Sequence, residues 1–241
     1  MSDTELNNPA GRVLALLRKA KETQARTIAD GFASVFEMDL TDNYGGLYRN
    51  LGLLNDNLNS IKERLQQTGN QHFIASYEKA LPHLQRIFAF QNSAQQWDGF
   101  KQTSIREQDL TTLEFCAAAL SRDLPERTFS KDELAELTKK IDELWREVLA
   151  SGLDKELKLT ILECLDQIRQ AIRDYKILGS KPIVSAVNNA VVCVINIGEV
   201  SPEHAPLMAR VREVVGFAAD LVTLGAVLYP LLQDAAKMLG N

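Results

Sequence analysis

Apolar residues recur every three or four positions in four stretches of the chain, and this spacing limits most strongly what the chain can fold into. The stretches are residues 47–65, 110–124, 134–148 and 161–175. A period near 3.6 residues lines these side chains along one side of an α-helix, whereas a strand alternates every two residues. Four narrow apolar seams predict long helices packed side by side. We therefore expect an all-α fold, an elongated bundle of about seven to eight helices.

Turn-forming residues divide these helices at consistent places. Ser130 and Glu133 have the spacing of a capping box, which predicts a helix start. Glycines at 152 and 179 predict helix ends, because glycine tolerates the left-handed conformation there. Pro82 predicts a kink or a break in the helix that carries residues 73–88.

Two segments are harder to assign from their pattern. Residues 91–103 show no period and are predicted to form a loop, whose Trp97 and Phe100 either pack beneath it or protrude as an anchor. Residues 191–197 are rich in β-branched side chains, which favours a strand. A single strand has no partner in this chain, and Ile183, Val187 and Val194 also fit one helical face. The segment is therefore predicted to be helical.

Charge density falls sharply near residue 180. Residues 181–241 hold only four basic and five acidic side chains, out of 27 and 32 in the whole chain. This change predicts a polar helical body at 1–180 and an apolar C-terminal helical hairpin at 181–241 that packs on it as one structural unit. The net charge of −5 gives no general attraction to nucleic acid, so no nucleic-acid partner is expected.

The longest apolar run is residues 214–232, in which Asp220 is the one charged side chain. Its leucines, valines and phenylalanine favour membrane insertion by roughly 3–6 kcal/mol, whereas Asp220 opposes it by about 2.5–3.5 kcal/mol. Two glycines and Pro230 remove most of the remainder. Burial in the protein recovers about 1.5–3 kcal/mol for each large apolar side chain. We expect the run in the core or in an oligomer interface, with conditional insertion and a plain membrane span as alternatives.

Motifs for catalysis and cofactor binding are missing from the sequence. It contains no phosphate-binding glycine loop and no nucleophile elbow, so no cofactor is expected. The histidines are His72, His83 and His204. None has a cysteine, aspartate or glutamate three or four residues away, the spacing of a helical metal site, so no metal is predicted.

The cysteines are few and scattered, at positions 116, 164 and 193, each close to aliphatic residues. An odd number of scattered cysteines is typical of small core residues in a reducing compartment and gives no disulfide framework. The N-terminus shows no basic segment followed by a long apolar stretch, so no secretory signal is expected. These features together predict a cytoplasmic protein. Peripheral attachment to the membrane is the alternative location.

Three surfaces are candidates for contact with a partner or a membrane. They are a basic first helix with Arg12, Arg18, Lys19 and Lys21, the aromatic pair Trp97 and Phe100, and the C-terminal residues Asp220, Leu224 and Leu228. We expect a non-catalytic helical interaction, scaffold or regulatory protein that acts through a protein partner or through self-association. The alternative is a membrane-active effector that shelters residues 182–239 and inserts them conditionally.

Overall fold

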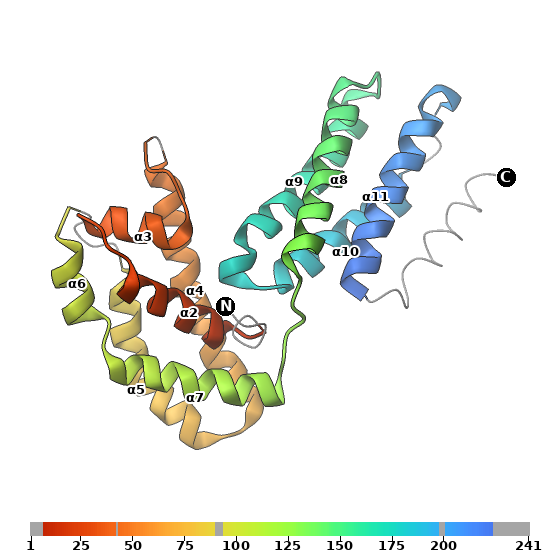
Figure 1. The fold of residues 1–241 in the computed structure, drawn as a ribbon. Helices are drawn as coiled ribbons and strands as arrows, with labels where there is room; N and C mark the ends of the chain where they lie inside the picture. The colour runs from red at the N-terminus through yellow and green to blue at the C-terminus, as the bar shows by residue number, and fades with distance from the viewer. Residues whose placement is uncertain (1–6, 42, 90–93, 198–200, 224–241) are drawn as a thin grey trace. The chain divides into compact units, whose positions relative to one another are not determined.

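The computed structural model describes residues 7–41, 43–89, 94–197 and 201–223. Over these residues it contains ten α-helices, one short 3₁₀ helix and one isolated β-bridge, between Thr27 and Gln96 (Figure 1). The all-α prediction is confirmed for this part of the chain. The expected number of helices was lower because α3 (Ile28–Phe36) and α6 (Trp97–Ser104) are too short to show a clear apolar period.

The chain forms two compact units whose boundary differs from the predicted one. Among the described residues, unit 1 covers positions 7–128 and 176–179, and unit 2 covers positions 129–175 and 180–223. The prediction placed a division at residue 180, where charge density changes. Charge density reports mainly the solvent-facing sides of helices, however, and helices of high and low charge share one core in unit 2.

The described residues of unit 1 form six helices. They are α2 (Pro9–Glu22), α3, α4 (Tyr44–Thr68), α5 (Gln71–Phe88), α6 and α7 (Glu107–Asp123). Helix α2 packs on α7 and α4, and α5 packs on α4 and α7 (Figure 1). The α4 seam at residues 47–65 is buried at each predicted position, so the helical phase read from the sequence is confirmed there.

Unit 2 gathers the remaining helices around a second apolar core. They are α8 (Lys131–Ala150), α9 (Lys155–Leu178), α10 (Lys181–Asn196), η1 (Pro202–His204) and α11 (Ala205–Thr223), with the last three residues of α9 belonging to unit 1. Leu137, Ile141, Leu144 and Val148 of α8 are completely buried, as their spacing predicts. The stretch 191–197 is helical up to Asn196, as expected.

The helix ends agree only in part with the turn signals. At the start of α8, the Glu133 amide donates to Ser130 Oγ over 3.1 Å and the Ser130 amide donates to Glu133 Oε2 over 2.6 Å, which confirms the capping box. Gly179 has a φ of 73°, as predicted. Gly152 does not adopt a left-handed conformation, because α8 ends in the extended Ser151. Pro82 lies inside α5, which runs through it without a break.

The first half of the apolar C-terminal run is part of the unit 2 core. Val214, Val215 and Ala218 of α11 are buried against the other helices, whereas Asp220 is partly exposed. Leu224 and Leu228 lie outside the described residues. Among the helices that the structure describes, none combines the length and hydropathy needed to cross a bilayer.

Candidate functional site

Arg12, predicted to contact a partner, is instead an internal residue of unit 1. Its guanidinium lies 2.5 Å from Glu126 Oε2 and donates to the carbonyl oxygens of Ile177 and Leu178, over 3.1 and 3.2 Å. The side chain is almost completely buried. Arg12 therefore bonds the last residues of α9 to the rest of unit 1, and its side chain is not exposed on the surface.

The three other basic residues of α2 are partly exposed, and each pairs with a glutamate. The pairs are Arg18–Glu114, Lys19–Glu37 and Lys21–Glu107. Hydrogen bonds from Lys176 and Lys19 lower the pKa of Glu37 to about 2, so this carboxylate is ionised at neutral pH. These glutamates come from other elements of unit 1 and offset much of the positive charge of α2. The sequence of α2 alone does not show them.

Trp97 and Phe100 belong to the core of unit 1, so of the two expected placements the buried one is confirmed. The predicted loop at 91–103 is wrong from Trp97 onward, where α6 begins and both rings are buried. The Trp97 indole donates to the carbonyl of Thr23 over 2.9 Å and meets the Phe32 ring edge-on at 5.3 Å between centroids. A Cβ at Gly31 would lie 2.2 Å from this indole, so glycine at 31 lets α3 approach Trp97.

One polar cluster joins α5 to the start of α7 and was not visible in the sequence. His83 Nδ1 lies 2.6 Å from Oδ2 of the buried Asp109. Arg106 donates to both oxygens of the same carboxylate, over 2.9 and 3.1 Å. The Asp109 carboxylate thus lies between Arg106, which precedes α7, and the imidazole of His83 from α5, whose Nδ1 forms no hydrogen bond. Within the described residues, no group of three or more histidine, cysteine or acidic side chains could hold a metal ion.

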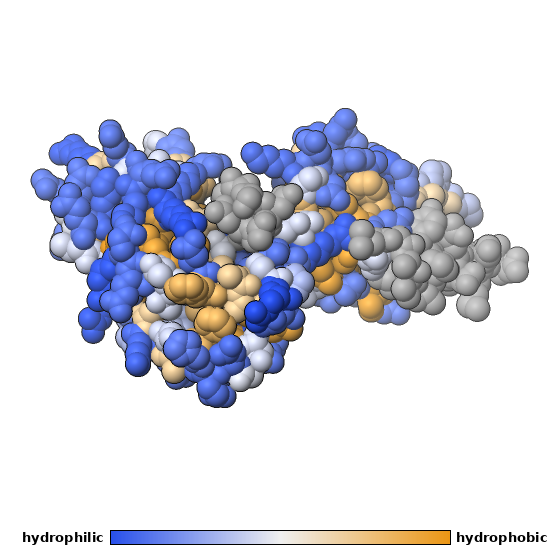
Figure 2. All heavy atoms as spheres, turned by 60° about the horizontal axis from the view of Figure 1, so that its bottom comes forward, coloured by the Kyte–Doolittle hydropathy of each residue, from blue (hydrophilic) through white to orange (hydrophobic). Residues whose placement is uncertain are grey.

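The most distinctive surface of unit 1 is an uncharged groove between α5 and α7, of about 540 Å³. It is lined by His72, Phe73, Ser76, Gln108, Thr111, Thr112, Phe115 and Cys116, and we call it the α5–α7 groove. None of these is an aspartate, glutamate, lysine or arginine. Burial raises the pKa of Cys116 to about 12, so its thiol is neutral. Figure 2 shows hydrophobic surface on the face of unit 1 that is turned forward, where α5 and α7 lie.

Phe115 is an exposed aromatic residue of the groove. Its side chain is 60% exposed, although the apolar seam of α7 is buried at Leu110, Leu113 and Leu120. Phe115 lies two positions beyond Leu113 and so points away from that seam. A phenylalanine at a position where helical spacing calls for a polar residue is the sequence signal that would have identified this surface.

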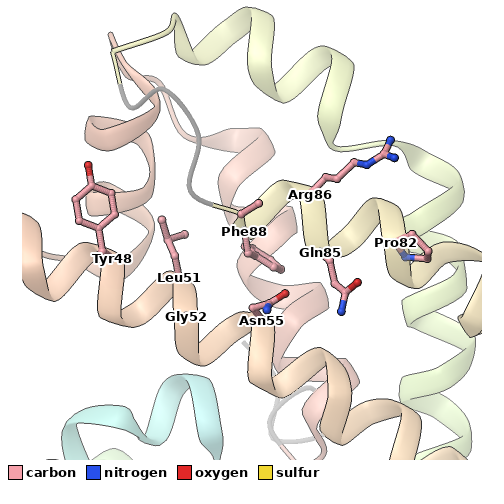
Figure 3. Close-up of a pocket in the computed structure, with 9 residues that line it drawn as sticks. Tyr48, Leu51, Gly52, Asn55, Pro82, Gln85, Arg86 and Phe88 are labelled. Atoms are coloured by element: carbon pink, nitrogen blue, oxygen red, sulfur yellow. The ribbon is translucent and has the colours of Figure 1, made fainter.

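A second groove of unit 1 lies between α4 and α5 and has a volume of about 550 Å³. Figure 3 shows Tyr48, Leu51 and Asn55 along α4, with Gln85 and Phe88 on the neighbouring α5. The side-chain amides of Asn55 and Gln85 and the Tyr48 hydroxyl make this groove more polar than the α5–α7 groove. Gly52 of α4 forms part of its wall, and a Cβ there would meet no atom within 4 Å.

Replacing glycine with alanine is expected to have opposite effects on stability at Gly52 of α4, which has open space beside it, and at Gly31 of α3, which lies against Trp97. Gly52→Ala should raise the free energy of unfolding by about 0.5–1 kcal/mol, because alanine favours the helix and no neighbour opposes its Cβ. Gly31→Ala should lower it by about 1–3 kcal/mol, because the new Cβ would clash with Trp97. Urea denaturation of both variants measures the difference. A destabilised Gly52→Ala variant would show that the wall of this groove is already filled.

Comparison with known proteins adds no family to these observations. No family model matches the chain, and no curated protein or solved structure matches it either.

Proposed function

We propose that the protein is a non-catalytic interaction module that holds an apolar helical segment of a partner protein in the α5–α7 groove. The observation that carries the proposal is Phe115, which is 60% exposed beside an uncharged groove of about 540 Å³. The central parts of protein interfaces are poor in charged residues and rich in aromatic ones, and this surface has both properties.

The shape of the groove favours a helix as the occupant. Two helices form its walls, and an amphipathic helix can lay its apolar side chains between such walls at positions i, i+3, i+4 and i+7. A volume of about 540 Å³ is large enough for several side chains. Gln108, Thr111 and Thr112 supply hydrogen-bonding groups along one wall, which can orient the bound segment.

The test is a selection of peptides from a displayed library of amphipathic helices. We expect the purified protein to bind peptides with helically spaced apolar residues, and Phe115→Glu to weaken their binding about tenfold or more, because it introduces a charge beside the apolar contact. Leu149→Glu is the matched control, since Leu149 of α8 is 58% exposed but lies in unit 2. Binding should be unchanged in this control.

Three outcomes separate the interpretations of this experiment. Equal binding by Phe115→Glu and the unaltered protein would contradict the proposal, provided both have the same melting temperature. Failure to select any peptide with helically spaced apolar residues would also contradict it. Light scattering gives the third outcome: a dimer that Phe115→Glu dissociates would identify a second copy of this chain as the occupant.

A membrane-active effector is the less supported alternative. Ile183 and Val187 of α10 and Val214 and Val215 of α11 are buried in the core of unit 2. Their insertion into a bilayer would require this core to come apart, which would expose the apolar faces of α8 and α9 as well. Flotation of the protein with anionic vesicles would reveal such insertion.

A further inference from the structure

Helix α10 of unit 2 turns an uncharged face to solvent. Its one charged residue is Lys181, at the first position of the helix. Every other α-helix in the described part of the chain carries charged residues beyond its first position. The exposed face of α10, which we call the α10 outer face, consists of Ser185, Asn188, Asn189, Val192, Ile195 and Asn196.

Two large apolar side chains lie on this outer face. Val192 is 57% exposed and Ile195 is 37% exposed. Single exposed apolar residues are common on proteins, but these two are three positions apart and therefore adjacent on the helix surface. Both are β-branched, which makes them poorer helix formers than alanine or leucine. The stability of α10 by itself therefore does not account for these two residues at exposed positions.

The outer face repeats the spacing of the buried face. The buried seam of α10 comprises Ile183, Val187, Ala190 and Val194, in steps of four, three and four residues. The outer face has Ser185, Asn188, Val192 and Ile195, in steps of three, four and three. This is the spacing by which one helix packs along another in a coiled coil. Helix α10 thus has a second seam, opposite the one that joins the core of unit 2.

The side chains of the outer face are of kinds that pair with themselves. In a two-fold symmetric dimer, residues close to the axis lie against the same residues of the other copy. An asparagine amide both donates and accepts, so it can hydrogen-bond to an identical amide. Valine and isoleucine pack on their equivalents, whereas a charged residue would repel its own. The net charge of −5 opposes association of two copies through a charged surface, and α10 avoids this repulsion.

We propose that the protein forms a homodimer in which the α10 outer faces of two copies pack against each other. Asn188 lies within the seam, where a buried asparagine in coiled coils fixes the register and the number of helices. The sixteen residues of α10 extend over about 24 Å. Contact through one helix of each copy is small for a permanent dimer, so the dimer is reversible and dissociates at micromolar concentration. It is independent of the α5–α7 groove, which belongs to unit 1.

Sedimentation equilibrium of the full-length protein over about a hundredfold range of concentration tests the proposal. The average mass should rise from that of one chain toward that of two. Val192→Glu should raise the dissociation constant about tenfold or more, because it places two carboxylates in one apolar contact. Leu149→Glu is the matched control, since Leu149 is 58% exposed on α8 of the same unit. Its dissociation constant and the melting temperatures of both variants should equal those of the unaltered protein.

A mixing experiment tests whether the face meets its own copy. Val192→Glu and Val192→Lys should each be monomeric alone, because each brings like charges together. Mixed in equal amounts, they should form a heterodimer, because the two charges are then opposite. Added salt should weaken this heterodimer, whereas it should tighten the dimer of the unaltered protein by screening the net charges of the two chains.

Three results would overturn the proposal. The first is a chain that stays monomeric at each concentration. The second is a dimer that Val192→Glu leaves intact; if Phe115→Glu dissociates it, the contact lies at the α5–α7 groove. The third is a pair of monomeric variants, Val192→Glu and Val192→Lys, that do not associate when mixed, because the outer face would then meet a different surface of the other copy.

Discussion

Arg12→Met is expected to lower the free energy of unfolding by about 3–5 kcal/mol, although the two side chains are similar in length. The substitution leaves the carboxylate of Glu126 without its closest buried partner. It also removes the donors to the carbonyls of Ile177 and Leu178. Removing one member of a buried charged cluster costs more than the pair itself contributes, because the groups left behind stay buried with fewer hydrogen bonds: Glu126 keeps only Arg64, and the Ile177 carbonyl keeps only Asn57.

A second arginine of the same helix provides the control. The Arg18 side chain is 42% exposed and pairs with an exposed Glu114, so Arg18→Met should change stability by less than about 1 kcal/mol. Urea denaturation followed by the fluorescence of Trp97, in a Trp145→Phe background, reports on unit 1. Replacing Glu126 with leucine alongside Arg12→Met should restore part of the loss. Equal effects of the two arginine substitutions would contradict the role assigned to Arg12.

Leu144→Asp is expected to unfold unit 2, with a loss of more than about 4 kcal/mol. Leu144 is completely buried in the core shared by the helices of unit 2, where a carboxylate finds no water. Leu149→Asp is the matched control on the same helix, because Leu149 is 58% exposed, and it should leave stability within about 0.5 kcal/mol of the unaltered protein.

Hydrogen exchange measured by mass spectrometry locates the damage in Leu144→Asp. Amides of α8 to α11 should lose protection, whereas amides of α2 to α7 should keep most of theirs, because unit 1 has a separate core. Loss of protection throughout the chain would argue that the two units unfold as one. Full protection in α8 would show that the helical phase assigned to Leu144 is wrong.

The sequence predicted helices well where an apolar seam is long. The seam of α8 is completely buried at Leu137, Ile141, Leu144 and Val148 and partly buried at its first position, Leu134, because regular spacing over several turns fixes which face turns inward. The sequence-based prediction of helices failed at α6, because eight residues form little more than two turns and no apolar period can be recognised in them. Only the packing of Trp97 against α3 shows why this segment is helical and buried.

The contacts between helices could not be predicted from the sequence. Spacing arguments relate residues three or four positions apart on one helix, whereas His83 and Asp109 lie together on two different helices. Such pairs depend on which helices are neighbours and at what height they cross. The basic residues of α2 were misjudged for the same reason, because Glu126, the partner of Arg12, comes from the segment beyond α7.

Residues 176–179 have a consequence for how the protein is made. They complete unit 1, where the Ile177 carbonyl accepts hydrogen bonds from Arg12 and Asn57, yet a ribosome synthesises them after α8 and nearly all of α9. The helices α2 to α7 therefore emerge first without the acceptors for two of their buried donors. Unit 1 reaches its final structure only when half of unit 2 has left the ribosome, so the biosynthesis of one unit governs the maturation of the other.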